Sequence, residues 1–209
     1  MKIIKPYYEI MSDLDEPKIL QQIEKIARTC YKSEDKITED SAKRMVKALI
    51  KNGHHAMLEH FSFTVKFVVD RAISLEIVRH RIASFAQEST RYCDYSKDKF
   101  NKEITFIVPL FFKNNLANYE TWVNACETAE RDYFLLLANG AKPEEARTVL
   151  PNSLKTEICV TMNLREWRHF FELRALDKTG KAHPQMKEVT VPLLEELKTK
   201  LPAIFGDLE

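Results

Sequence analysis

Residues 61–81 read FSFTVKFVVDRAISLEIVRHR, and within them one hydrophobic period gives way to another. Up to Val69, apolar and polar residues alternate, which predicts a half-buried strand. Asp70 then stands where an N-cap is expected, and the residues that follow predict a short helix over 70–81. A strand that continues directly into a helix favours a fold in which helices and strands are mixed.

Other segments add further helices and short strands. Apolar residues at helical spacing, with proline, glycine or capping residues at the ends, predict helices over about 16–31, 38–52, 113–139, 143–150, 163–176 and 185–200. Alternating residues predict strands over 103–108 and 154–162. We therefore expect residues 1–209 to form a single α+β domain with high helix content and a small mixed or antiparallel sheet.

Several predicted helices carry recognisable signals at or near their ends. Thr38 is expected to cap a helix that finishes just before Gly53. Asn163 and Glu166 resemble a capping box at the start of another helix. Pro192 is expected to interrupt the last helix, because proline cannot donate a backbone hydrogen bond.

Composition limits the kind of protein this can be. The 209 residues carry a net charge of +1, with 44% hydrophobic and 30% charged residues, so we expect a packed core and no general affinity for nucleic acid or membranes. No segment resembles a signal peptide or reaches the roughly 20 apolar residues of a membrane span. The 4 cysteines form no CxxC pair, so no zinc or redox motif is expected. Free cysteines without an export signal favour a cytoplasmic location.

Glycine is scarce in the chain. Its 4 glycines lie far from one another, which excludes the glycine-rich loops that bind dinucleotides and nucleoside triphosphates. If the protein binds a phosphorylated ligand, side chains must therefore do much of the work that backbone amides do in such loops.

Arginines and hydrogen-bonding side chains gather in parts of the sequence. They are Arg71, Glu76, Arg79, His80 and Arg81, then Gln87, Ser89 and Arg91, and finally Arg147, Asn163, Arg165, His169 and Arg174. Taken singly, each arginine is most simply interpreted as a solvated helix residue or a weak surface ion pair. Arg79 and Arg81, however, would point to different sides of a helix and could bind anionic groups on both. Arginine forms two parallel charge-assisted hydrogen bonds to phosphate, so the pattern favours a nucleotide site.

A metal site and a serine nucleophile are weaker interpretations. His54, His55 and His60 cluster near Glu59 but form no HExxH pattern, and no bound metal is expected. Ser89 has no histidine–carboxylate pair nearby in the sequence to activate it. We interpret it as a phosphate or nucleotide ligand.

The segment RHRIASFAQESTRY, residues 79–92, resembles the RHRxxSxxxxSxR signature of the flavin-dependent thymidylate synthases (ThyX). Every fixed position of that signature is present, namely Arg79, His80, Arg81, Ser84, Ser89 and Arg91. The segments GHHAMLEH, EEARTVLP, NLREWRHFFELRA and HPQM are similar to other segments of the family. The resemblance extends over about residues 15–190.

The resemblance implies a ThyX-like fold and a homotetramer whose active sites are built by several subunits. It implies the conversion of dUMP to dTMP, with methylenetetrahydrofolate as the carbon donor, NADPH as the reductant and FAD as the redox carrier. The residues implied in cofactor binding are His54, Ala56, Glu59, Arg79, His80, Arg81, Gln87, Asn163, Leu164, Arg165, His169 and His183. Those implied in dUMP binding are Arg71, Glu76, Ile77, Val78, Arg79, Gln87, Glu88, Ser89, Thr90, Arg91, Arg147 and Arg174. Arg174 would be catalytic, because it would stabilise negative charge developing on the pyrimidine.

The chain departs from the family pattern at a few positions. Ala86 and Gln87 stand where some members carry Asn and Glu. Glu76 replaces a Gln, and His169 replaces an Asn, of some members. The stretch LDKTGKA lengthens the loop before His183. The segment IASFA is expected to be a short non-helical turn that separates the flavin contacts from the nucleotide contacts.

Other functions stay open on the residues alone. A cysteine-dependent nucleotide methylase would use Cys93, which follows the signature and is otherwise interpreted as a small half-buried residue. A non-catalytic nucleotide- or nucleic-acid-binding module would need only the arginines. The near-zero net charge and the lack of an RNA-binding signature argue against such a module.

Overall fold

The computed structural model describes residues 1–209, and contacts between residues divide the chain into two compact units. Unit 1 consists of Met1–Tyr7, Phe67–Arg79 and Ala86–Cys159, and unit 2 of Tyr8–Lys66, His80–Phe85 and Val160–Glu209. The chain passes between the units several times, so neither is a contiguous stretch of sequence. The single domain expected from the sequence stays a prediction.

The strands form two small sheets. In unit 1, β1 (Lys2–Ile4) pairs in parallel with β5 (Thr105–Ile107). The other sheet has the strand order β2–β3–β6–β4, with the bounds β2 (Tyr7–Ile10), β3 (Ser62–Asp70), β6 (Lys155–Asn163) and β4 (Ala83–Gln87). Every second residue of β6 is buried, as its alternating sequence predicts.

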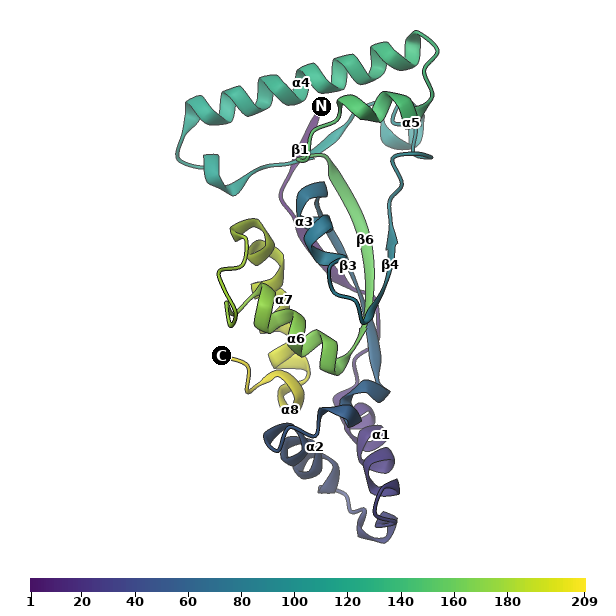
Figure 1. Cartoon of the computed structure of the whole chain (residues 1–209), viewed down its shortest axis with the longest axis vertical. Coiled ribbons are helices and arrows are strands. Elements are labelled where there is room, and N and C mark those ends of the chain that lie inside the picture. The colour runs from purple at the N-terminus through teal and green to yellow at the C-terminus, as the bar shows by residue number, and fades with distance from the viewer. The chain divides into compact units, whose positions relative to one another are not determined.

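Unit 1 contains α3 (Arg71–Ile77), α4 (Leu116–Ala138) and α5 (Pro143–Ala146), with short 3-10 turns at Asp98–Phe100, Leu110–Phe112 and Arg147–Val149. Its core includes Phe106, Tyr133 and Leu154, which are at most 2% exposed. The long helix α4 contributes only part of one face to this core and packs against α5 (Figure 1).

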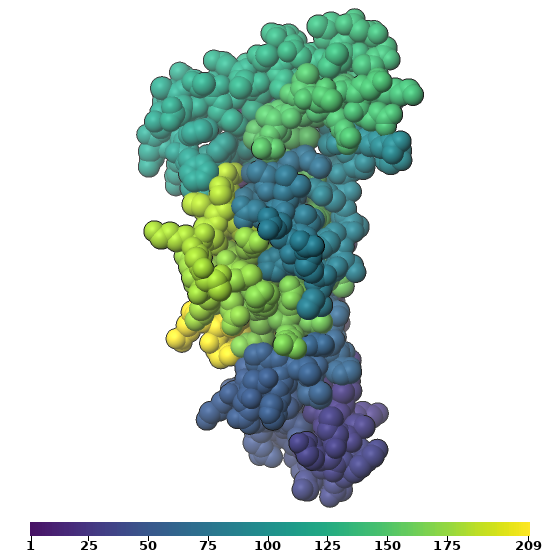
Figure 2. Space-filling view, in the orientation of Figure 1, coloured from purple at the N-terminus to yellow at the C-terminus, as the bar shows by residue number.

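Unit 2 contains α1 (Glu16–Thr29), α2 (Ser41–Lys51), α6 (Leu164–Arg174), α7 (Pro184–Lys200) and α8 (Pro202–Phe205), with 3-10 turns at Glu34–Lys36 and His55–His60. Its core is centred on Trp167, whose ring stacks on Phe63 at a centroid distance of 4.9 Å. The indole N–H donates to the backbone oxygen of Phe63 at 3.2 Å. In the space-filling view the C-terminal segment (yellow) lies beside the surface of α6 and α7 (Figure 2).

The mixture of small sheets and many helices confirms the predicted α+β class. The predicted helix signals at Asp70, Asn163 and Gly53 are also confirmed. Asp70 accepts from the backbone N–H of Ile73 at 2.8 Å, and Asn163 accepts from that of Glu166 at 2.8 Å. Gly53 follows the C-cap of α2 with a φ of +72°, a conformation that favours glycine. None of the helices combines the length and apolar composition that crossing a bilayer requires.

The helix predicted over residues 70–81 is shorter than expected. It ends at Ile77, so Arg79 and Arg81 do not lie on it, and the predicted turn IASFA is largely the strand β4. No glycine or proline stands in residues 71–86, so no helix-ending residue explains the end of α3. The physical reason is tertiary, since the chain leaves the helix to place β4 beside β6 in the sheet.

Other boundaries also differ from the predictions. The helix α2 has Asp40 as its N-cap rather than Thr38, whose backbone N–H instead bonds to Ser41 Oγ at 2.8 Å. Pro192 lies inside α7 without interrupting it, and it occupies the exposed side of that helix. Three further elements, β1, β2 and α8, were not predicted, because they are too short to show a hydrophobic period.

Candidate functional site

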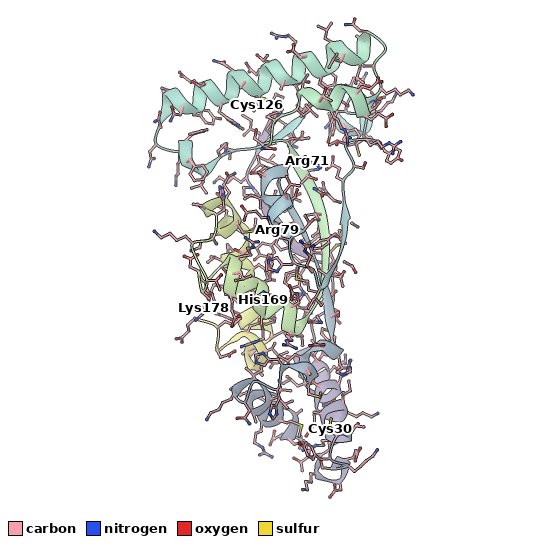
Figure 3. The ribbon with its side chains drawn as sticks, in the orientation of Figure 1. Cys30, Arg71, Arg79, Cys126, His169 and Lys178 are labelled. Carbon is pink, nitrogen blue, oxygen red and sulfur yellow. The ribbon has the colours of Figure 1, made fainter.

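The two predicted sets of binding residues lie largely in different units. All the residues predicted to bind dUMP belong to unit 1 except Arg174. All those predicted to bind the cofactor belong to unit 2 except Arg79 and Gln87. Arg71 lies at the start of α3 and Arg79 just beyond its end, whereas His169 lies on α6 (Figure 3).

In unit 1, the segment that follows β4 is held by hydrogen bonds to the start of β6. The Gln87 side-chain amide donates to Ser74 Oγ at 2.8 Å and to Thr156 Oγ1 at 3.2 Å. The backbone N–H of Glu88 donates to the backbone oxygen of Glu157 at 2.9 Å. This part of the predicted nucleotide site is therefore fixed in position before any ligand binds.

The Glu88 carboxylate is also held within unit 1. It accepts from Lys155 Nζ at 3.0 Å and from the Tyr95 hydroxyl at 3.0 Å. Lys155 bonds in addition to Glu157 at 2.6 Å. Burial alone would lower the pKa of Lys155, but the hydrogen bonds and charges of Glu157 and Glu88 raise it above its ordinary value. The Glu88 carboxylate thus has two protein partners, and its contact with dUMP stays a prediction.

The predicted phosphate-binding arginines of unit 1 are mostly exposed. Arg147 donates to Thr90 Oγ1 at 3.2 Å, and Arg91 pairs with Glu144 at 2.7 Å. The Arg91 side chain is 57% exposed, and such surface pairs contribute only about 0–1 kcal/mol, so a phosphate could displace the carboxylate. Arg79 is exposed, and its side chain has no partner in the chain.

Three other predicted residues of unit 1 have distinct surroundings. The Ile77 side chain is 0% exposed and packs in the core, so only its backbone could meet a ligand. Ser89 Oγ accepts from the backbone N–H of Arg91 at 3.3 Å. Burial and the charge of Glu88 raise the pKa of the Cys93 thiol, which disfavours the thiolate that a nucleophilic mechanism needs.

In unit 2, a cavity of about 460 Å³ adjoins the N-terminal half of α6. Four residues predicted to bind the cofactor line it, namely Glu59, Asn163, Arg165 and His169. It is also lined by His55, Ile82, Glu166, Arg168 and Glu172, which the sequence analysis did not assign to the site. Sequence signals for some of them were present, because His55 lies between the predicted His54 and Ala56, and Glu172 lies two helical turns after Arg165.

The cavity offers cations and hydrogen-bonding groups. Arg165 pairs with Glu59 at 2.6 Å, with side-chain exposures of 54% and 44%, so a phosphate could displace that carboxylate. Arg168 is buried and forms two hydrogen bonds to the Asp207 carboxylate, at 2.6 and 2.7 Å. We therefore assign it a structural role rather than a ligand contact. Arg81 is exposed, and its side chain has no partner in the chain.

The remaining residues predicted to bind the cofactor do not line this cavity. His54 and Ala56 are exposed at the 3-10 turn His55–His60. Leu164 is 0% exposed, and its backbone N–H donates to the Phe61 oxygen at 3.0 Å. His183 is the N-cap of α7, where its Nδ1 accepts from the backbone N–H of Gln185 at 3.3 Å.

His80 lies between Glu166 and Arg174, two charged residues of unit 2. It is only 4% exposed, its Nδ1 lies 3.1 Å from Glu166 Oε1, and Arg174 Nε donates to its Nε2 at 3.2 Å. Burial, with the positive charges of Arg174 and His169, lowers the pKa of His80 to about 4. Both ring nitrogens of His80 therefore have protein partners. The contact between His80 and the flavin stays a prediction.

No group of three or more His, Cys, Asp or Glu side chains is arranged to hold a metal ion. His54, His55, His60 and Glu59, the cluster considered for zinc, therefore provide no such site.

Comparisons with known proteins identify the family. Residues 14–203 match the family model described as thymidylate synthase complementing protein. The flavin-dependent thymidylate synthase of Pyrococcus abyssi is 37% identical over 164 residues, which cover 78% of this chain and 65% of that protein. The enzyme of the same name from Geobacter sulfurreducens is 36% identical over 188 residues, covering 87% of this chain and 78% of that protein.

A solved structure shares the fold. The UMP/dUMP methylase PolB from Streptomyces cacaoi, bound with 5-Br dUMP, has a TM-score of 0.81 and 23% sequence identity. The likeness covers 99% of this chain and 96% of that one. From the family model, the relatives and the complete arginine signature together, the chain belongs to the family of flavin-dependent thymidylate synthases.

Proposed function

We propose that the protein catalyses the reductive methylation of dUMP to dTMP. Methylenetetrahydrofolate would be the carbon donor, FAD the redox carrier and NADPH its reductant. The observation that carries the proposal is the complete signature from Arg79 to Arg91 on a chain of this family. The chain spans about 65% of the length of its Pyrococcus abyssi relative, so the activity is argued from this chain's own residues.

The residues of unit 1 suit a nucleotide monophosphate. Arg91 and Arg147 are exposed enough to form paired hydrogen bonds to a phosphate, and Thr90 already accepts from Arg147. Ser89 adds a hydroxyl beside them. Gln87 and Glu88 hold the segment against β6, so that the nucleotide would meet a preformed surface.

The residues of unit 2 suit a flavin nucleotide. At the cavity, Arg165 supplies positive charge for the pyrophosphate, while Asn163 and His169 supply groups that can hydrogen-bond to a heterocycle. Arg81, which is exposed and precedes the lining residue Ile82, would add a second positive charge. The donor set at the cavity therefore fits FAD. A reduced flavin, when bound, supplies the hydride for the reaction.

Arg174 is the residue that we propose to activate the pyrimidine. Its positively charged guanidinium would stabilise negative charge developing on N3 and the carbonyl oxygens of the base. No thiol attack is required by this role, which agrees with the raised pKa of Cys93. We further propose a homotetramer whose active sites are built by several subunits.

The proposal is tested by the absorbance spectrum of the purified protein. We expect a bound flavin whose visible bands shift when dUMP is added. Arg174→Ala should lower turnover by roughly 100-fold or more while leaving flavin binding nearly intact. Arg131→Ala is the matched control, because Arg131 is 69% exposed on α4 and has no role in the site. A colourless protein that does not take up FAD contradicts the proposal.

A further inference from the structure

A buried histidine in unit 2 uses both of its ring nitrogens. His80 Nδ1 faces Glu166, and His80 Nε2 faces Arg174. The ring also packs edge-on against Phe170, with centroids 4.9 Å apart. His80 is only 4% exposed, and Glu166, although it lines the cavity beside α6, is 7% exposed.

The chemistry of the partners determines where the histidine proton lies. A guanidinium can only donate, so His80 Nε2 must present its lone pair to Arg174. The proton of a neutral ring is then on Nδ1, from which it is donated to the Glu166 carboxylate. Glu166 is itself fixed, because its backbone N–H donates to the Asn163 cap at the start of α6.

Arg174 is the last residue of α6 and is anchored at both its backbone and its side chain. Its backbone oxygen accepts from Thr190 Oγ1 on α7 at 2.7 Å. Its Nε donates to His80, which sets the direction of the guanidinium plane. An arginine side chain that is not anchored loses rotamer entropy when it binds, so such anchoring prepares the group for its ligand.

We propose that His80, with its tautomer fixed by Glu166, is a positioning residue that orients the Arg174 guanidinium toward the reacting pyrimidine. This inference rests on the proposed function, because it needs Arg174 to act on the base. It differs from the sequence-based expectation that His80 binds the flavin directly. A ring that is 4% exposed, with both nitrogens occupied, is better placed to hold Arg174 than to meet a cofactor.

The main test is a double-mutant cycle on the flavin-loaded protein. His80→Leu should lower kcat roughly tenfold or more, with smaller changes in flavin content and in the Kd for dUMP. His80→Gln, whose amide can donate and accept, should recover part of this loss. In the Arg174→Ala background, His80→Leu should cause no further loss, because the two residues act as one unit.

The outcomes separate this inference from the proposed function. If Arg174→Ala keeps full turnover, the proposed role of Arg174 fails first. If Arg174→Ala is slow but the two losses multiply, His80 acts independently and the inference is wrong. It is also wrong if His80→Leu only lowers flavin affinity and turns over normally when saturated with FAD. Should His80→Leu not fold, ¹⁵N NMR of the unaltered protein decides, since a neutral ring protonated at Nε2 overturns the inference.

Discussion

The imidazole of His80 is a side chain whose charge is strongly constrained by its surroundings. Burial and the nearby charges of Arg174 and His169 all favour the neutral ring, and its pKa falls from 6.5 to about 4. Burial also raises the pKa of Glu166 above its ordinary value. Protonation of His80 at low pH therefore costs folding free energy, whereas at neutral pH its neutral ring donates a directional hydrogen bond to Glu166.

The shift in the pKa of His80 predicts a dependence of stability on pH. Between pH 4 and 6.5 the unfolded chain binds more protons at this residue than the folded chain does, so the free energy of unfolding rises with pH. From pH 7 to pH 5 the unaltered protein should lose about 2 kcal/mol relative to His80→Gln, which cannot titrate there. Urea unfolding of both proteins at the two pH values measures this difference. A difference that does not change with pH contradicts the prediction.

Cys93 provides a second prediction for a single residue. Its thiol is half-buried and has a raised pKa, and its backbone N–H bonds to the oxygen of Ser89. Replacing it with the similarly small Ser should therefore keep turnover within about threefold. Complete loss of turnover in Cys93→Ser, with the flavin still bound, would instead favour the cysteine-dependent methylase.

At the scale of elements, the start of β6 organises the predicted nucleotide segment. Thr156 binds the Gln87 amide, Glu157 accepts from the Glu88 backbone, and Lys155 joins the carboxylates of Glu88 and Glu157. The Lys155 side chain is 19% exposed, so these interactions are only partly screened by water. The strand therefore sets the conformation of residues that follow β4.

Removing the Lys155 ammonium should loosen this segment. Lys155→Met leaves two neighbouring carboxylates without their cation, which we expect to cost about 2 kcal/mol of unfolding free energy and to weaken dUMP binding. Thermal unfolding and dUMP titration of the flavin spectrum measure the two effects. The matched control is Lys97→Met, since Lys97 is 67% exposed and pairs only with Asp94. If Lys155→Met and Lys97→Met have the same stability and the same affinity for dUMP, then β6 does not organise the nucleotide segment.

At the scale of the whole molecule, β3 and β6 each contribute residues to both compact units. A chain that crosses between units inside its strands should unfold as one cooperative domain, as the sequence analysis expects. Phe63 in unit 2 and Phe106 in unit 1 are at most 1% exposed, so either residue can test this coupling.

We expect Phe63→Ala and Phe106→Ala each to lower the free energy of unfolding by about 3–5 kcal/mol in a single transition. Trp122 lies in unit 1 and Trp167 in unit 2, so variants with one tryptophan report on each unit separately. In Trp122→Phe, adding Phe106→Ala should shift the unfolding curve of Trp167. A Trp167 signal that stays native while unit 1 unfolds would show two independent domains.

Local chemistry makes several features of this protein predictable from the sequence. Asp70 and Asn163 begin their helices because a short acceptor side chain satisfies a backbone N–H nearby in the chain. The alternation in β6 follows from the period of a strand. The family, too, was predicted from the sequence, because residues 79–91 resemble its signature.

Tertiary structure alone decided the features that depend on distant partners. No local signal ends α3 at Ile77, because that end follows from the pairing of β4 with β6. Glu166 and Arg174 come to lie on either side of His80 although they are 86 and 94 residues away in sequence. The sequence by itself therefore determined which residue types are present, where the helices capped by Asp70 and Asn163 begin, and the alternation of β6. The tertiary structure decided which nitrogen of His80 meets which charge, because proton position depends on neighbours that no local pattern specifies.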